Sequence, residues 1–152
     1  MRRPADADWQ PTVPALVNLV AASGAPRLRA AFAEAGLDGI RPAQAVALVP
    51  LAAGGLHASD LADRLQVSRQ AVAQAITGLE RHGYVTREPN PLDARTRIIE
   101  LTPRGRRALS VMRSNAVDLE KRWEQLLGRR RLAELRETLQ RLLAGQTEPA
   151  GE

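Results

Sequence analysis

Hydrophobic residues recur at helical spacing in two short runs that follow each other closely along the chain. Leu61, Ala62 and Leu65 share one face of a first helix, which this spacing predicts at about 57–66. A second helix is predicted at about 69–82, because its apolar positions are four and three residues apart. That second helix turns inward the side chains of Val72, Ile76 and Leu79.

Residues with strong local preferences mark the ends of the second helix. Gln66 and Val67 are expected to form the turn before it, with Val67 packed inward. Ser68 is a good N-cap, because its hydroxyl can accept a hydrogen bond from a backbone N–H of the first turn. Gly83 favours the left-handed conformation in which a helix ends. The segment is therefore predicted to be a helix-turn-helix.

A β-hairpin is predicted immediately after this pair of helices. Residues 84–87 and 97–101 have the composition of two short strands, and the second strand turns Ile99 and Leu101 inward. The intervening residues 88–96 include two prolines and are predicted to form the tip of the hairpin. A hairpin at this place is typical of the wing of a winged helix-turn-helix.

The C-terminal part predicts two helices with narrow apolar seams. Thr102 and Pro103 suit the N-cap and first position of the first of them. Apolar residues step by three and four over 109–126, Gly128 interrupts the run, and the pattern resumes over 132–142. Part of each seam packs within one subunit, and the remainder predicts a homodimer. With the N-terminal segment, the residues assigned to dimerisation are Leu16, Val20, Leu119, Leu126, Leu132, Leu135, Leu139 and Leu142.

Glycine and proline predict breaks in the N-terminal half. Gly24 and Pro26 should kink or break a helix at about 12–35. Pro50 should bend or interrupt a helix at 42–53, because it removes a backbone hydrogen bond. The predicted fold is mainly α with a small β-wing.

The 152 residues are expected to form a single domain. A winged helix-turn-helix at about 42–107 is flanked by dimerisation helices at about 12–35 and 103–144.

Positive charge is concentrated around the predicted wing. Residues 81–107 contain seven arginines and three acidic residues, a net charge of +4 out of +5 for the whole chain. Such a stripe is typical of phosphate binding and predicts double-stranded DNA as the partner. The alternative is a winged-helix module that binds only proteins, since a fold alone does not decide function. The residues predicted to bind DNA are Ser68, Arg69, Gln70, Ala73, Gln74, Thr77, Arg81, Asp93, Arg95 and Arg97.

Short motifs follow this plan in a fixed order. They are RPAQ at 41–44, LA at 61–62, VS at 67–68, GYVTR at 83–87, DAR at 93–95 and LTPRG at 101–105. Together they resemble the MarR family of bacterial transcription regulators, strongly over about residues 40–110. The resemblance implies an intertwined homodimer on a pseudo-palindromic operator, repression as the mode of control, and release of DNA when a small aromatic or anionic effector binds.

The resemblance also suggests roles for individual residues. It assigns Arg95 to the minor groove and Asp93 to holding the wing in place, an arrangement that suits the negative potential of a narrow minor groove. The chain departs from the family's usual pattern at Arg41 and His57, where relatives often have Thr, and at Ala73-Gln74, where many have Ser or Thr followed by Arg. Candidate effector-binding residues are Arg27, Phe32, Arg41 and Trp123, with the alternative that the aromatic pair is core and the arginines are solvated.

Other classes of function lack their residues. There is no cysteine, the two histidines are far apart in sequence, and no catalytic motif or Gly-rich phosphate loop occurs, so neither an enzyme nor a metal or cofactor site is predicted. No apolar run is long enough to span a membrane. Acidic residues within 2–8 argue against an export signal, and the protein is expected in the cytoplasm, associated with the nucleoid.

Overall fold

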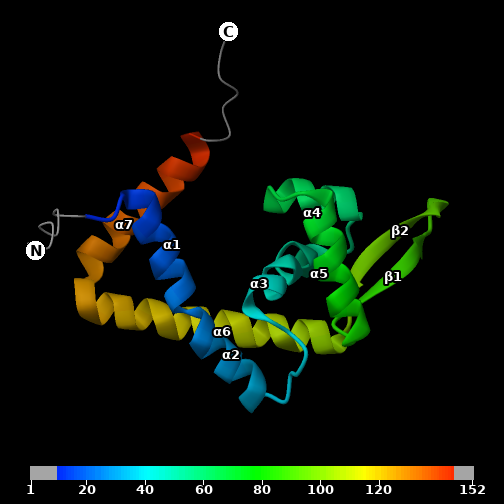
Figure 1. Ribbon diagram of the computed structural model, residues 1–152, viewed down its shortest axis with the longest axis horizontal. Coiled ribbons are helices and arrows are strands. Elements are labelled where there is room, and N and C mark those ends of the chain that lie inside the picture. Colours follow the sequence, from blue (N-terminus) through cyan, green and yellow to red (C-terminus); the bar gives the residue numbers. More distant parts are fainter. Residues whose placement is uncertain (1–9, 146–152) are drawn as a thin grey trace, which may run out of the picture. The chain divides into compact units, whose positions relative to one another are not determined.

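The computed structural model describes residues 10–145, which form two compact units. The first unit ends at Met112 and the second begins at Arg113. Most of the described residues are helical, and the strands form one two-stranded antiparallel sheet (Figure 1). The predicted fold class, mainly α with a small wing, is confirmed. Residues 2–8, which bear on the predicted absence of an export signal, lie outside the described part.

The first unit begins with two helices separated by a single glycine. Helix α1 spans Val13–Ser23 and α2 spans Ala25–Glu34, so the predicted break at Gly24 and Pro26 is confirmed. Pro26 lies in the first turn of α2, where its missing N–H costs no helical hydrogen bond. Helix α1 has no buried residue, whereas α2 buries Phe32.

The segment around Pro50 is helical in three short pieces. Helix α3 (Pro42–Ala45) is followed by the 3₁₀ turns η1 (Val46–Leu48) and η2 (Pro50–Ala53). Pro50 has no N–H to donate to the Val46 carbonyl, which instead accepts from Val49 N at 3.2 Å. The predicted interruption is confirmed, and it starts earlier than the proline itself.

The helix-turn-helix consists of α4 (Ala58–Leu65) and α5 (Arg69–Arg81). The Ser68 hydroxyl accepts from Ala71 N at 3.1 Å, and Gly83 has φ +77°, so both predicted ends of α5 are confirmed. Val67 was expected to pack inward, and this is wrong because its side chain is 47% exposed. Gln66 adopts a left-handed conformation that turns the chain there, so Val67 lies outside the core.

A continuous apolar core lies between these helices and the base of the wing. Its fully buried side chains are mostly branched aliphatic, as the low aromatic content requires, with two of the chain's few aromatic residues among them. The predicted inner faces of α4 and α5 both contribute, which confirms the helical spacing. The largest fully buried side chains are Phe32, Leu48, Leu61, Val72, Ile76, Leu79, Tyr84 and Val85.

The wing strands are longer than the sequence suggested. Strand β1 spans Val85–Asn90 and β2 spans Asp93–Leu101, so the tip is reduced to two residues. Pro89, expected in the tip, pairs with Arg97 inside the sheet. It is tolerated because β1 is an edge strand and alternate residues of such a strand point their N–H groups away from the partner. Leu56 forms an isolated bridge with Ile99 on the other side of β2.

Two long helices complete the chain. Helix α6 (Pro103–Leu127) starts in the first unit and continues into the second, and α7 (Arg129–Gly145) follows it. Gly128 separates them with φ +80°, as predicted. The Thr102 hydroxyl accepts from Gly105 N at 3.0 Å and caps α6, which is also as predicted.

Candidate nucleic-acid interface

The outer face of α5 is entirely exposed. Val72, Ile76 and Leu79 fix the rotation of the helix, because all three are buried. This rotation leaves the polar side of α5 in solvent over its whole length. A helix buried on one face and polar on the other is what a DNA groove can accommodate. The predicted contact residues of α5 that are exposed are Arg69, Gln70, Ala73, Gln74, Thr77 and Arg81.

A groove of about 610 Å³ runs beside this face, between α5 and the start of α3. Arg41 and Gln44 line it from α3, opposite Gln74 and Arg81. Gln44 is fixed there, because its Oε1 accepts from Arg41 N at 3.4 Å. The sequence suggested Arg41 only as an effector contact, and the structure places it next to the predicted DNA-binding residues.

The hydroxyl of Thr77 forms two hydrogen bonds within the protein. Its hydroxyl donates to Ala73 O at 2.8 Å and accepts from Arg87 Nη2 at 3.2 Å. Arg87 also pairs with Glu80 at 3.1 Å. The hydroxyl proton is therefore used by the helix backbone, and Thr77 can offer DNA its methyl group and one remaining lone pair. Arg87 ties the start of the wing to α5.

The wing tip is organised by short hydrogen bonds from side chains. Asp93 Oδ1 accepts from Arg95 N at 3.0 Å, and Thr96 donates its hydroxyl proton to Asp93 O at 3.0 Å. Asn90 Oδ1 accepts from Leu92 N at 3.0 Å. Arg95 is exposed at this tip, and Leu92 is 95% exposed. The predicted pair Asp93 and Arg95 thus lies within one turn, with the arginine side chain free to contact a partner.

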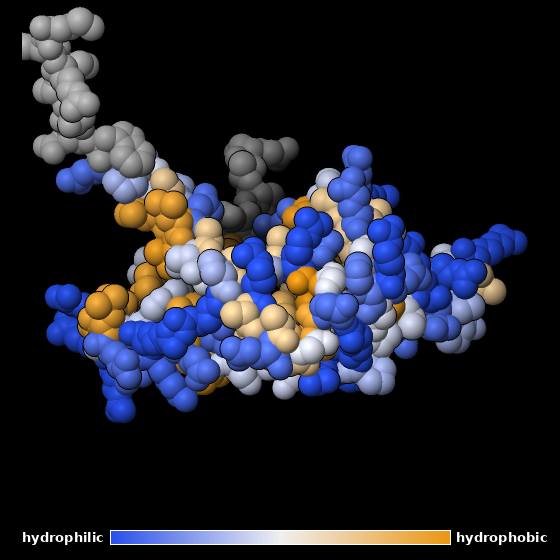
Figure 2. All heavy atoms as spheres, turned by 60° about the horizontal axis from the view of Figure 1, so that its bottom comes forward, coloured by the Kyte–Doolittle hydropathy of each residue, from blue (hydrophilic) through white to orange (hydrophobic). Residues whose placement is uncertain are grey.

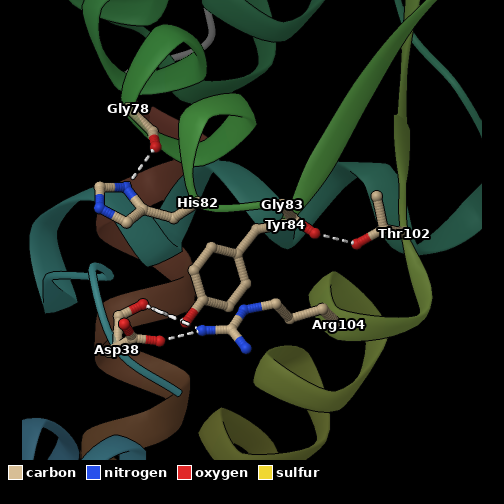
Figure 3. Close-up of polar contacts among 7 residues, drawn as sticks. All are labelled: Asp38, Gly78, His82, Gly83, Tyr84, Thr102 and Arg104. Atoms are coloured by element: carbon tan, nitrogen blue, oxygen red, sulfur yellow. Dashed lines mark hydrogen bonds and ion pairs between the residues drawn. The ribbon is translucent and has the colours of Figure 1, made fainter.

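A polar cluster holds the end of α5 and the base of the wing against the loop after α2 (Figure 3). Tyr84 donates its hydroxyl proton to Asp38 O at 2.5 Å, and Arg104 forms an ion pair with the Asp38 carboxylate. The Arg104 guanidinium lies 4.8 Å from the centre of the Tyr84 ring, within the range of cation–π attraction. The hydrogen bond from Arg104 lowers the pKa of Asp38, and burial raises the pKa of Tyr84.

Two further contacts in Figure 3 fix the chain where α5 ends. Thr102 donates to Gly83 O at 2.5 Å, and the His82 ring bonds Gly78 O at 2.9 Å through Nδ1. These contacts join the last turn of α5, the start of β1 and the start of α6. The wing therefore extends from a fixed base, and the fold of the first unit sets the position of the wing relative to α5.

The second unit has an apolar groove of about 290 Å³ between α6 and α7. Trp123 is half-buried in it, and Glu120 forms an ion pair with Arg136 at its edge. Leu132 is the one buried residue among those described in this unit. Of the residues predicted for dimerisation, Leu119, Leu132, Leu135 and Leu139 line the groove, and Leu126 and Leu142 are exposed.

Helix α1 also exposes apolar side chains. Leu16 is 45% exposed and Val20 is 47% exposed, and both were predicted to take part in dimerisation. Figure 2 shows hydrophobic residues gathered over this helix, in contrast to the hydrophilic surface of the wing. An apolar surface of this kind on a folded protein marks a place where another surface binds.

The candidate effector residues do not lie together in one site. Phe32 is 1% exposed in the core of the first unit, and Arg27 is exposed. Arg41 lines the groove beside α5, whereas Trp123 lines the groove of the second unit. Residues 10–145 contain no group of three or more His, Asp or Glu side chains placed to hold a metal ion. In the same part of the chain, no helix is both long and apolar enough to cross a bilayer.

Comparison with protein families gives a match over residues 38–96, to the model of the MarR family. These residues run from the loop before α3 into β2. A curated relative, the transcriptional activatory protein BadR of Rhodopseudomonas palustris, is 38% identical over 63 residues. That alignment covers 41% of this chain and 36% of the relative, so the two proteins correspond over about a third of the relative's length.

Solved structures with the same fold cover far more of the chain. The reduced form of MarR from E. coli is 22% identical, with a TM-score of 0.73 over 90% of this chain and 99% of that one. The MepR–DNA complex of S. aureus is 20% identical, with a TM-score of 0.70 over 90% and 97%. These likenesses extend the shared fold from the matched segment to the flanking helices.

Proposed function

We propose that this chain is a regulator of the MarR family, which binds double-stranded DNA as a homodimer and regulates transcription. Members of this family are transcription regulators, not enzymes. The observation that supports DNA binding most directly is the exposed polar face of α5 beside a basic wing. A DNA-bound relative, MepR, shares the fold. We infer that the protein acts in the cytoplasm, at the nucleoid, where a bacterial DNA partner lies.

Sequence preference is assigned to α5. Gln70, Gln74 and Thr77 contact base edges in the major groove, where Gln can pair with adenine through two hydrogen bonds. Ala73 lies between them and offers a methyl group to thymine. At the N-terminal end of α5, Ser68 and Arg69 contact phosphate, and Arg81 does so near the C-terminal end.

Affinity is assigned mainly to the wing. Arg95 enters the minor groove, with its backbone held by Asp93, and Arg97 contacts the sugar–phosphate backbone. The groove between α3 and α5 adds Arg41, whose exposed guanidinium suits a phosphate beside the major groove. These contacts are largely independent of sequence.

The second unit and α1 support the proposal of a homodimer. The groove between α6 and α7 and the exposed leucines and valines of α1 leave more apolar surface in water than a monomer tolerates well. A two-fold dimer presents two copies of α5, which suits a pseudo-palindromic operator with half-sites about one helical turn apart. Such a protein acts as a repressor when its operator overlaps a promoter.

We also propose that a small aromatic or anionic effector controls DNA binding. Arg41 offers a cation in one groove, and Trp123 offers an aromatic wall in the other. An effector releases DNA only if it binds better to the protein conformation that cannot bind operator. Thermal-shift screening of phenolic and carboxylate compounds, followed by operator titration with each hit, tests this part.

The test of DNA binding is a fluorescence-anisotropy titration with DNA that flanks the protein's own gene, against scrambled DNA of equal length. We expect tighter binding to one flanking segment, with a steep dependence on salt. Arg95→Ala should weaken binding to every sequence and reduce the log–log salt slope by about 0.9 if one phosphate-type contact is lost. Equal affinity for all sequences would favour the alternative, a winged-helix module for protein contacts.

A further inference from the structure

His57 connects the start of α4 to the wing. Its Nδ1 lies 3.1 Å from the carbonyl oxygen of Arg97, and its Nε2 lies 3.5 Å from Nδ2 of Asn90. His57 occupies the N-cap position of α4, yet its side chain forms no capping hydrogen bond. The imidazole is therefore used by the wing and not by the helix that it precedes.

The pairing pattern of β2 shows what the His57 ring replaces. Leu56 and Ile99 exchange both backbone hydrogen bonds, at 3.1 and 2.9 Å. In an antiparallel ladder the next such pair lies two residues further on, which would be Ala58 with Arg97. Because α4 begins at Ala58, the ladder ends there. The ring N–H of His57 bonds the Arg97 carbonyl that the next backbone N–H would have bonded.

Asn90 transmits this contact to the tip of the wing. Its Nδ2 donates to the Thr96 hydroxyl at 3.2 Å, and its Oδ1 accepts from Leu92 N at 3.0 Å. Asn90 and Thr96 are half-buried, whereas the residues between them are exposed. Asn90 cannot rotate its amide by 180° without losing both of these bonds. Its N–H group therefore faces His57 as a donor.

This geometry defines the tautomer of His57. The Arg97 carbonyl can only accept, so Nδ1 must bear the proton, and Nε2 then has the lone pair that the Asn90 amide requires. We propose that His57, as its Nδ1–H tautomer, is a wing-positioning residue that fixes the hairpin bearing Arg95 against the start of α4. The proposal rests on the proposed function only in that the wing contacts DNA.

The first test uses the free protein and the variant His57→Ser. Serine is a better N-cap, so α4 should be at least as stable, while the contact with the wing is lost. We expect an unchanged or higher Tm, together with a fall in the NMR order parameters of the Leu92 and Arg95 amides from about 0.85 towards 0.6. In the parent, the ¹⁵N shifts of the His57 ring should show a proton on Nδ1. A proton on Nε2, or unchanged order parameters in the variant, would overturn the proposal.

The second test measures DNA affinity in a double-mutant cycle. His57→Ser should weaken binding about two- to tenfold, the range for one neutral hydrogen bond. In the Arg95→Ala background the same change should have little further effect, because the positioned side chain is absent. Ser59→Ala, in the same turn of α4, should leave affinity unchanged. Additive effects would overturn the positioning role. If the parent binds no DNA, the proposed function fails, and the NMR result still decides the role of His57.

Discussion

The two units of this chain bury their apolar residues to very different extents. In the first, side chains from α2, the α3–η2 segment, α4, α5, the sheet and the start of α6 close around one core, and eight large side chains are almost completely buried. In the second, α6 and α7 contact each other along one side, and Leu126 and Leu142 remain 81% and 51% exposed. Both units show equally regular apolar spacing in the sequence.

The difference lies in the number of elements available to cover each apolar face. A core needs at least two packed layers that enclose it, and the first unit has helices and a sheet that surround its leucines. Two helices share only one interface, so a seam wider than that interface stays in solvent. The core of the first unit is therefore complete within one chain, although α1 contributes no buried residue to it. The second unit has the exposed apolar surface expected of a subunit interface.

The largest effect is expected when charge is placed in the apolar groove of the second unit. Replacing both Leu135 and Leu139 with Glu should dissociate the proposed homodimer or unfold the unit, because unpaired carboxylates are costly to bury. Operator affinity should fall with it, since two half-sites must be bound together. Light scattering at micromolar concentration measures the mass of the parent and the variant.

Gln140→Glu is the matched control, because Gln140 is exposed on the same helix. It adds a carboxylate without placing it in the groove, so the mass should not change. A parent protein that is already monomeric at micromolar concentration would contradict the dimer.

The next largest effect is expected from Gly105→Ala in the first unit. A Cβ there would lie 2.0 Å from the backbone oxygen of Tyr84, which cannot move without shifting the base of the wing. We expect the free energy of unfolding to fall by about 1–3 kcal/mol or more. Gly145→Ala in the second unit has no atom within 4 Å of the new Cβ and serves as the control. Chemical denaturation followed by circular dichroism should separate the two variants, and equal stabilities would show that α6 can draw away from the sheet.

A smaller effect, confined to recognition, is expected from Gln74→Ala on the outer face of α5. The side chain lies beside the groove and packs against no core, so stability should be preserved. Preference at one or two base pairs should relax by about 1–3 kcal/mol. Titration of operator and of singly substituted operators measures this change, with Arg95→Ala as the comparison that weakens all of them alike. If the variant discriminates as well as the parent, α5 is rotated differently in the major groove than proposed.

Features with local causes could be predicted from the sequence. Apolar spacing located α4, α5, α6 and α7, while the Ser68 cap and the breaks at Gly83 and Gly128 follow from backbone preferences of single residues. Val67 was misplaced because its orientation depends on the left-handed turn at Gln66, which an ordinary residue rarely adopts. The predicted strands are shorter than β1 and β2 because proline favours a turn by local preference, whereas the pairing of Pro89 with Arg97 places it inside the sheet.

Features with distant causes were not predictable. Tyr84 bonds a residue 46 positions away, and Arg104 one that is 66 positions away. The contact of His57 with the wing spans 40 positions. No periodicity relates such residues, because the fold itself brings them together. Within the candidate interface, the sequence indicated the exposed face of α5 but did not place Arg41 beside it.

The smallest expected effect concerns the ion pair between Asp38 and Arg104. The hydrogen bond from Arg104 is the main reason that the pKa of Asp38 is lowered, with the backbone hydrogen bond and the positive charge of Arg104 adding to it. A lowered carboxyl pKa means that the contact stabilises the fold fully above the ordinary pKa and ceases to do so as the pH falls through the lowered value. Asp38→Asn should therefore reduce Tm slightly at neutral pH, and the difference from the parent should disappear as the pH falls through the lowered pKa of Asp38. Asp118→Asn, which changes an exposed pair with Lys121 at 3.9 Å in the second unit, is the control and should alter Tm even less. A difference for Asp38→Asn that persists at low pH would show that the charge of the Asp38 side chain is not the source of the stabilisation.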